Sequence, residues 1–347
     1  MTFLRNCWYL AAWDHELDGG LLARTLLNEP VVMYRAADGK PVALEDRCCH
    51  RSLPLSMGRR VGNDIQCGYH GLVFDAEGRC VQVPGQSTVP PGARVQSYPA
   101  VERWKAVWIW MGDPALADPA KIPDWWWMDH PEWRPVKGPV LEIAGNYQLL
   151  NDNLLDLSHT TYIHHDSIGN AAVVEFPIKT ERFDDGVRMT RWVIDRPAPP
   201  LYQEIAGFKG NVDRWQIVTS TVPCFSDVYI GLVDTGCSVE EGVARGGLEF
   251  HNLNAATPET DTSVFQFYAH ARHFKIDSAE VDEIYWRDFQ RVFRQDVVAI
   301  GAQQQNIRTF GAAPNVDINV DAPGLALRRL IADAIADEQT AGVRKRA

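Results

Sequence analysis

The sequence predicts an α+β protein with two domains, and two features of the residue pattern support this. Residues 6–113 consist of β-rich runs of 4 to 8 residues separated by turn residues. Residues 112–138 then hold five prolines and four tryptophans, which break both helical and strand periodicity. We therefore expect a small antiparallel β domain over residues 1–118 and a larger β-rich domain with one long late helix over residues 119–347. The runs in the first domain are PVVMYRA, PVALEDR, DIQCGY, LVFDAEG and AVWIWMG.

The second domain mixes strand-like stretches with two helical segments, residues 147–163 and roughly 278–307. The late helix has the form of a capping box that opens at Asp277 with Glu280 three residues on, although Ser278 could be the cap instead. The strand-like stretches are RMTRWVID, RWQIVTSTV, DVYIGLV and SVFQFYAHA.

Charge and cysteine content restrict the function classes. The 347 residues include 34 Lys and Arg against 45 Asp and Glu, a net charge of −11, so we expect no nucleic-acid partner. No stretch approaches the roughly 20 apolar residues of a transmembrane helix, so we expect no membrane partner and a cytoplasmic protein. Seven scattered cysteines indicate reduced thiols or metal ligands rather than a disulfide scaffold.

Two mixed Cys-His pairs form the first chemical motif. Cys48-x-His50 is followed, after sixteen residues, by Cys67-x-x-His70. One cysteine and one histidine from each of two loops can give two thiolates to one iron and two imidazoles to another, which is the ligand set of a Rieske [2Fe–2S] centre. The pattern therefore predicts that these four residues bind such a cluster.

A tetrahedral zinc site is the main alternative for these four side chains, because Zn²⁺ accepts mixed sets of cysteine and histidine. Typical zinc fingers, however, group cysteine with cysteine and histidine with histidine, whereas each loop here mixes the two. Cys49 could replace Cys48 as a ligand, but the Cys-x-His spacing favours Cys48. The iron–sulfur cluster is the favoured prediction.

With this motif, the chain resembles the oxygenase component of the Rieske non-haem iron oxygenases over nearly its whole length. The resemblance extends to the aromatic O-demethylase branch typified by vanillate O-demethylase, with arylsulfonate methyl-monooxygenases as near relatives. It implies a Rieske domain over residues 1–118 and a helix-grip catalytic domain, an antiparallel sheet with a long helix, over residues 119–347. The segments that carry it include NCWYLAAW, LNEPVVMYR and ERWKAVWIWMGDP.

A second cluster of metal ligands lies in Asp156-x-x-His159-x₄-His164. The two histidines are five residues apart, about 500° on a regular helix, so the helix must distort or end for both imidazoles to meet. Two histidines and one carboxylate form the facial triad that binds Fe(II) and leaves positions for O₂ and substrate. Asp156 is one candidate for the carboxylate.

The late helix offers a better carboxylate, because its apolar stripe contains Asp296 at a core position. A buried acid must be paired, protonated or bound to a metal. The pattern Asp-x₄-Gly-Ala-Gln resembles the family's third-ligand helix, although relatives often have Glu where this chain has Gly301. The resemblance therefore implies that His159, His164 and Asp296 bind the mononuclear iron. His165 and Asp166 are adjacent alternatives that the x₄ spacing disfavours.

The resemblance also gives Asp156 a catalytic role, that of an electron bridge. The matching aspartate in the family connects the mononuclear iron to a cluster-binding histidine of a neighbouring subunit in a homotrimer, so Asp156 would meet His70 or His50 of a neighbour. Asn153, one turn earlier, is either an ordinary helix-face amide or a support for the iron ligands.

The chain contains no G-x-G-x-x-G unit in a βαβ context and no flavin motif. Electrons must then come from a separate protein, for which the resemblance implies an NADH-dependent flavin and iron–sulfur reductase. The implied reaction uses O₂ to oxidise an aromatic carboxylate or sulfonate, with O-demethylation of a methoxybenzoate to a phenol and formaldehyde as first choice. The alternatives are an arylsulfonate methyl-monooxygenase, another aromatic hydroxylase, or a Rieske electron-transfer protein without enzyme activity.

No linear motif marks the substrate pocket. Tyr162, His251, His270 and Arg272 could contact an aromatic acid, although each is more often an ordinary core or surface residue. The WWW run at residues 125–127 is expected to pack rather than to form an aromatic cage.

Overall fold

The computed structural model describes residues 3–311 and 316–344. It divides into two compact units, of which the first comprises Met1–Asp124 together with Thr257–Asp261. The short second segment belongs there because the backbone N–H groups of residues 27 and 28 donate to carbonyls of residues 258 and 259, at 3.0 and 2.9 Å. The domain boundary expected between residues 118 and 119 stays a prediction.

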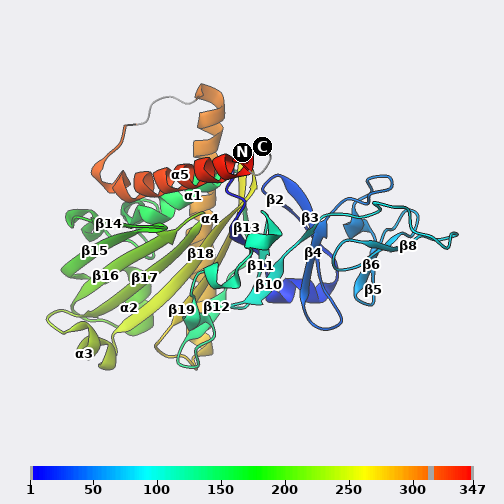
Figure 1. Ribbon diagram of the computed structural model, residues 1–347. Helices are drawn as coiled ribbons and strands as arrows, with labels where there is room; N and C mark the ends of the chain where they lie inside the picture. The colour runs from blue at the N-terminus through cyan, green and yellow to red at the C-terminus, as the bar shows by residue number, and fades with distance from the viewer. Residues whose placement is uncertain (1–2, 312–315, 345–347) are drawn as a thin grey trace. The chain divides into compact units, whose positions relative to one another are not determined.

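The first unit is built from three small antiparallel sheets in the part of the chain that the structure describes (Figure 1). Their strand orders are β1-β11-β10, β2-β3-β4-β9 and β5-β6-β7-β8. The predicted antiparallel β architecture of this region is confirmed. The strands are β1 (Trp8–Trp13), β2 (Leu22–Leu26), β3 (Glu29–Arg35), β4 (Pro41–Glu45), β5 (Arg59–Val61), β6 (Asp64–Gln66), β7 (Val73–Phe74), β8 (Cys80–Gln82), β9 (Ser97–Tyr98), β10 (Ala100–Arg103) and β11 (Ala106–Trp110).

The second unit contains one eight-stranded antiparallel sheet among its described residues. The strand order is β12-β19-β18-β17-β16-β15-β14, and β13 also pairs with β19. This arrangement, with a long helix against the sheet, confirms the predicted fold class. The strands are β12 (Arg134–Lys137), β13 (Leu141–Ile143), β14 (Lys179–Phe183), β15 (Gly186–Pro197), β16 (Asn211–Thr221), β17 (Phe225–Asp234), β18 (Leu248–Thr260) and β19 (Ser263–Arg272).

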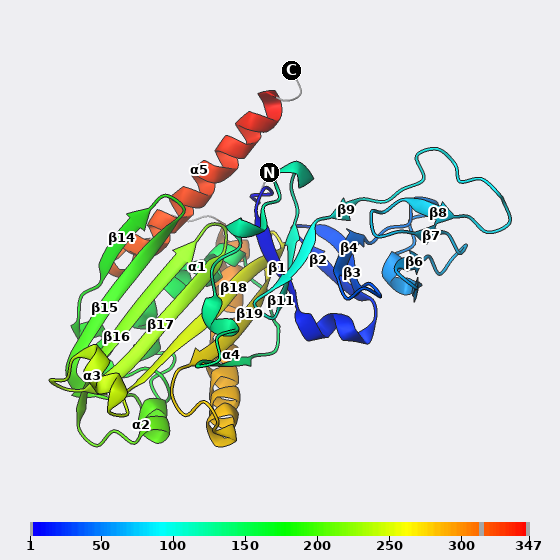
Figure 2. The same ribbon diagram turned by 60° about the horizontal axis from the view of Figure 1, so that its bottom comes forward.

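Helices α1, α4 and α5 pack on the large sheet, the short α3 contacts β17, and α4 runs behind the strands in both ribbon views (Figures 1 and 2). α1 contacts β16 and β17, α4 contacts β12 and β13, and α5 contacts β14 and β15. The helices are α1 (Tyr147–Leu155), α2 (Pro200–Ala206), α3 (Val239–Ala244), α4 (Ala279–Phe310) and α5 (Ala322–Arg344).

The two predicted helices differ from the structure in instructive ways. α1 ends at Leu155, and a 3-10 helix, Leu157–Thr161, follows it, so the regular helix does end before the two histidines, as their spacing required. α4 begins after Ser278, whose hydroxyl accepts the N–H of Val281, so Ser278 and not Asp277 is the cap.

The expectation of one long late helix is wrong, because α5 follows α4. The buried apolar side chains of α5 include Leu327, Leu330 and Ile331, and its Arg328 forms an ion pair with Asp152 of α1. Tertiary contacts of this kind stabilise a helix whose sequence periodicity alone is weak.

Strand alternation gives the large sheet two chemically different faces. On β16, Arg214 and Gln216 face the helices and line a pocket with α4, whereas Trp215 lies on the other face. There Trp215 packs over Gly231 of β17, where an added Cβ would lie 1.6 Å from a Trp215 ring carbon. The close approach of the indole to the backbone therefore requires glycine at this position.

We predict that Gly231→Ala destabilises the second unit by about 1–3 kcal/mol, because the added methyl overpacks a central strand. Gly210→Ala is the matched control, since nothing lies within 4 Å of a Cβ built there. Denaturant melts followed by circular dichroism should show a lower midpoint for Gly231→Ala only; equal midpoints for the two variants would contradict the packing argument.

Candidate functional site

The two cluster loops share one hydrogen-bond pattern. In each, the cysteine N–H donates to the carbonyl five residues on, and the N–H four residues on donates back to the cysteine carbonyl. The residue that donates back adopts a left-handed backbone, with φ of 60° at Ser52 and 73° at Gly71. The bonds are Cys48 to Leu53 (2.9 Å), Ser52 to Cys48 (2.9 Å), Cys67 to Leu72 (2.8 Å) and Gly71 to Cys67 (3.1 Å).

These loops bring together the four predicted cluster residues. Cys48 and Cys67 are buried in the core of the first unit, each 2% exposed. The rings of His50 and His70 are exposed, with their centroids 4.6 Å apart. Cys49, the alternative ligand, is exposed to solvent. The arrangement keeps one thiol pair inside and one imidazole pair outside.

The environment of the thiols fits a metal cluster. Burial, together with the adjacent Cys67 thiol, raises the pKa of Cys48 to about 11. Two thiolates at this place therefore need cationic compensation, which a [2Fe–2S] cluster supplies. The loops also approach closely: a Cβ on Gly68 would lie 2.6 Å from the Met57 carbonyl oxygen, so this position also requires glycine.

The second site forms where α1 ends. The Asp156 carboxylate accepts the N–H of Ser158 at 2.9 Å and caps the 3-10 helix that carries His159. The chain then turns so that the rings of His159 and His164 lie 5.2 Å apart between centroids. The helix break expected from the sequence is what allows the imidazoles to meet.

Each imidazole is oriented by a bond from its Nδ1. His159 Nδ1 donates to the carbonyl oxygen of Asp156, and His164 Nδ1 donates to Gln295 Oε1 at 2.7 Å. These bonds place the proton on Nδ1 and leave each Nε2 as the ligand atom. Gln295 has an orienting role that the sequence did not indicate.

Asp296 of α4 completes the cluster. Its side chain is 3% exposed, and its Oδ1 lies 3.2 Å from His164 Nε2 and 3.7 Å from His159 Nε2. Asn153 Nδ2 donates to the same oxygen at 3.1 Å, so this amide supports the acid, one of the two roles considered for it. The three potential ligand atoms all lie within 4.8 Å of one another, which fits a mononuclear metal site.

The electrostatic surroundings of the two histidines differ. Burial lowers the pKa of His159, so this imidazole is neutral and ready to bind a metal at neutral pH. Burial acts in the same direction on His164, but its hydrogen bond to Asp296 and the charge of that carboxylate outweigh burial and raise its pKa.

The three ligand candidates lie in a pocket between α4, α1 and the sheet. Its walls are mainly apolar, and three polar residues face it from the strands, Arg214, Gln216 and Asn252. The apolar lining is Leu154, Leu157, Ile168, Val228, Ile230, Phe250, Phe289, Val292 and Phe293.

None of the substrate contacts considered from the sequence lines this pocket. Tyr162 is 70% exposed, and His270 is buried with its ring centroid 3.6 Å from that of Phe289. Arg272 forms an ion pair with Asp282. His251 stacks on Trp127, on the opposite face of β18 from Asn252.

Strand parity identifies the polar pocket residues once the buried face of β16 is known. Arg214 and Gln216 occupy the same alternating positions of β16 as the buried Val212 and Val218. A charged residue at an apolar-facing position of a strand is the same signal that identified Asp296 in α4.

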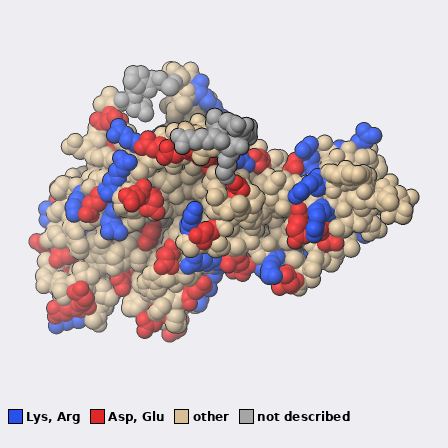
Figure 3. Space-filling model, in the orientation of Figure 1, with Lys and Arg blue, Asp and Glu red and all other residues tan. Residues whose placement is uncertain are grey.

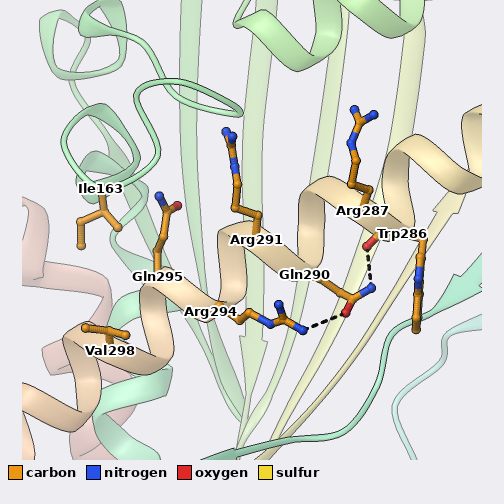
Figure 4. A pocket seen from close by; sticks show the side chains of 8 residues that line it. All are labelled: Ile163, Trp286, Arg287, Gln290, Arg291, Arg294, Gln295 and Val298. Atoms are coloured by element: carbon orange, nitrogen blue, oxygen red, sulfur yellow. Dashed lines mark hydrogen bonds between the residues drawn. The ribbon is translucent and has the colours of Figure 1, made fainter.

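A larger hollow, about 690 Å³, lies on the outer side of α4 and lacks such chemistry (Figure 4). Its arginines are exposed and bonded: Arg294 donates to Gln290, and Arg291 pairs with Asp166. Apart from the four cluster residues, the described part of the chain brings the potential ligand atoms of three residues within 4.8 Å of one another at His159, His164 and Asp296, which line the inner pocket and not this hollow.

The chain matches two known families. Residues 7–99 match the Rieske [2Fe-2S] domain, and residues 143–337 match the vanillate O-demethylase oxygenase C-terminal domain. The chain belongs to the Rieske oxygenase components. This Rieske oxygenase is therefore an enzyme with a [2Fe–2S] domain and a non-haem iron domain, and the alternative of a plain electron-transfer protein is set aside.

Relatives match over nearly the full length. The chain is 39% identical to the toluene-4-sulfonate monooxygenase system iron-sulfur subunit TsaM1 of Comamonas testosteroni, over 98% of this chain and 99% of that protein. It is 35% identical to a vanillate O-demethylase oxygenase subunit of a Pseudomonas species, over 98% and 97%. A crystal structure of dicamba monooxygenase with non-heme iron and dicamba superposes with a TM-score of 0.84 at 32% identity, over 99% and 100%.

Among residues 3–311 and 316–344, no helix combines the length and the apolar character needed to cross a membrane.

We predict that Asp296→Ala loses the mononuclear iron and keeps the visible absorption of the [2Fe–2S] cluster, because the two sets of ligands come from different units. Asp288→Ala is the matched control on the same helix, since Asp288 pairs with Arg287 and does not line the pocket of the three ligand candidates. Iron and acid-labile sulfide are measured per chain. Unchanged iron in Asp296→Ala would transfer the ligand role to another acid, such as Asp156 or Asp166.

Proposed function

We propose that this Rieske oxygenase oxidises an aromatic acid, with O-demethylation of a methoxybenzoate to the phenol and formaldehyde as the first candidate. The observation that carries the proposal is the position of His159, His164 and Asp296 on one side of a buried pocket with aromatic and aliphatic walls. Such walls suit a benzene ring and exclude water from it.

The residues have distinct roles in this proposal. Cys48, His50, Cys67 and His70 hold the [2Fe–2S] cluster, and His159, His164 and Asp296 hold the iron. When bound, the iron supplies O₂ binding and activation, and the cluster supplies electrons one at a time. Asn153 and Gln295 fix the orientation of Asp296 and His164.

Oxidation of an arylsulfonate methyl group is the second candidate. The toluene-4-sulfonate relatives favour it, with 39% and 38% identity to this chain. Both candidates place an oxidisable methyl carbon at the iron side of the same pocket. Demethylation differs because the hydroxylated methoxy carbon is a hemiacetal, which releases formaldehyde.

Partners follow from what the sequence lacks. Without a dinucleotide-binding motif, the protein needs a separate NADH-dependent flavin and iron–sulfur reductase. We propose a homotrimer in which Asp156 of one chain meets His70 or His50 of its neighbour. A cytoplasmic location belongs to the same proposal, because NADH and free cysteines are both features of a reducing compartment.

The test is turnover of purified protein with a matching reductase, NADH and ¹⁸O₂. Methoxybenzoates should give formaldehyde and a phenol, with one ¹⁸O atom in the formaldehyde before exchange and one in water. Toluenesulfonate should instead give a labelled benzylic alcohol. NADH and O₂ consumption without any oxidised arene across the panel would refute the proposal.

We predict that Asp156→Asn keeps both metal centres and loses coupled oxygenation. Asparagine caps a helix as well as aspartate does, so the bond to Ser158 survives while the charge is removed. Asp166→Asn, on an exposed acid paired with Arg291, is the matched control. Metal content and product per O₂ consumed are measured for each variant. If Asp156→Asn formed as much product per O₂ consumed as the wild type, Asp156 would not be the electron bridge.

The trimer is tested by mixing Asp156→Asn with the cluster-dead variant Cys67→Ser under conditions that exchange subunits. Activity should partly return, because the Cys67→Ser chain supplies an intact bridge and iron while the Asp156→Asn chain supplies the cluster. No recovery despite demonstrated exchange would mean that electrons stay within one chain.

A further inference from the structure

Two arginines are buried under the helices, and one of them has no acid near it among the described residues. Arg191 of β15 is 2% exposed, and Arg214 of β16 is 3% exposed. In the described parts of the chain neither is joined to Asp or Glu in an ion pair; the negative charge of Asp156 acts on Arg191, whereas no acid acts on Arg214. The Nε atoms of both, and Nη1 of Arg214, have no hydrogen-bond partner.

The protein compensates these charges only in part. Arg191 Nη1 donates weakly to Gln216 Oε1 at 3.4 Å, and the Arg214 guanidinium lies 5.2 Å from the centroid of the Tyr202 ring. Burial lowers the pKa of Arg214, which Tyr202 partly offsets, but a guanidinium stays charged at neutral pH. A buried cation without a counter-ion destabilises the folded chain, so its retention indicates a role outside folding.

The location of Arg214 identifies that role. It lines the same pocket as the three iron-ligand candidates. Beside it, Gln216 Nε2 is a second buried donor without a partner. The arginines of the outer groove on α4 differ, because they are exposed and hold protein partners (Figure 4).

We propose that Arg214, aided by Gln216, binds the carboxylate or sulfonate group of the aromatic substrate. This inference rests on the proposed function and adds the residue that selects acids over neutral arenes. The ring would then lie against Val228, Ile230 and Phe250, with the acid group held by β16 and the oxidised carbon at the iron side. Arg191 is a positioning residue, because it holds Gln216 through Oε1 and leaves Nε2 for the anion.

Binding tests this directly without turnover. Isothermal titration with 4-methoxybenzoate and its neutral partner 4-methoxybenzamide, and with 4-toluenesulfonate and 4-toluenesulfonamide, should show that the protein prefers each anion. Arg214→Gln should weaken anion binding about 10- to 100-fold, the range expected for lost charged hydrogen bonds, and change amide binding less than threefold. Arg214→Lys should keep part of the anion preference, because it keeps the charge.

Arg188→Gln is the matched control. Arg188 lies on β15 three residues before Arg191 and on the outer face, where it is exposed and donates to Thr219. It should bind every probe as the wild type does. The proposal would be overturned if the wild type bound neither anion, or if it bound anion and amide with equal affinity. It would also be overturned if Arg214→Gln lost affinity for anion and amide by the same factor.

Thermal stability separates binding from a structural role. Arg214→Met removes the unpaired cation and keeps much of the volume, so without ligand its melting temperature should equal or exceed that of the wild type. A large fall in melting temperature for both Arg214→Met and Arg214→Gln would give Arg214 a structural role instead.

The outcomes for the two proposals are distinguishable. Arg214-dependent anion binding without oxidation of any arene would contradict the proposed function and leave the anion site intact. If the wild type oxidises aromatic acids, and Arg214→Gln still prefers acids over amides as strongly as the wild type does, the anion site would be contradicted and the proposed function would stand.

Discussion

The carboxylate of Asp296 in the interior of α4 is the constraint on which the catalytic unit depends. A buried carboxylate needs compensation. Here Asn153 on α1 donates a hydrogen bond to it, and the two histidines beyond the end of α1 place their Nε2 atoms beside it, where the three side chains could share a cation. If α1 continued as a regular helix past Leu155, His159 and His164 could not both turn toward this oxygen. The break between α1 and the following 3-10 helix, capped by Asp156, is therefore a consequence of the site rather than an irregularity of the helix.

The alternation of side chains along the strands lets one sheet serve two purposes. Toward the helices, β16, β17 and β18 supply a cation, two amides and apolar walls to a single pocket. On the other face, Trp215 and Tyr229 pack together, and Tyr229 donates to Glu249. A register slip of one residue would exchange these two sets, so the close packing of Trp215 over Gly231 helps keep the polar residues in the pocket.

How far the sequence could predict each site depends on how local its ligands are. The cluster residues lie in two short loops at fixed spacing, so no knowledge of the fold was needed to group them. The iron site required joining residues more than a hundred positions apart, and an acid on an apolar stripe made that possible. The sequence did not identify Arg214, because its position on β16 points to the pocket only once the buried face of that strand is known. It did not identify Gln295, because nothing in a helical pattern marks a residue that orients a histidine.

The two sites also differ in what can reach them, and this fits a division of labour between protein and small-molecule partners. His50 and His70 are exposed, Met57 and Tyr69 nearby are 66% and 63% exposed, and the right-hand end of the surface drawn in Figure 3 is largely uncharged. Such a surface suits direct contact with another protein, which is how an electron is delivered over a short distance. Asp296, by contrast, is buried between helix and sheet in a pocket with mainly apolar walls. In the proposed function, electrons and the aromatic acid therefore reach the protein through different units, and the proposed bridge must lie at the edge of the buried site. Asp156, at the end of α1 and only partly buried, satisfies that requirement.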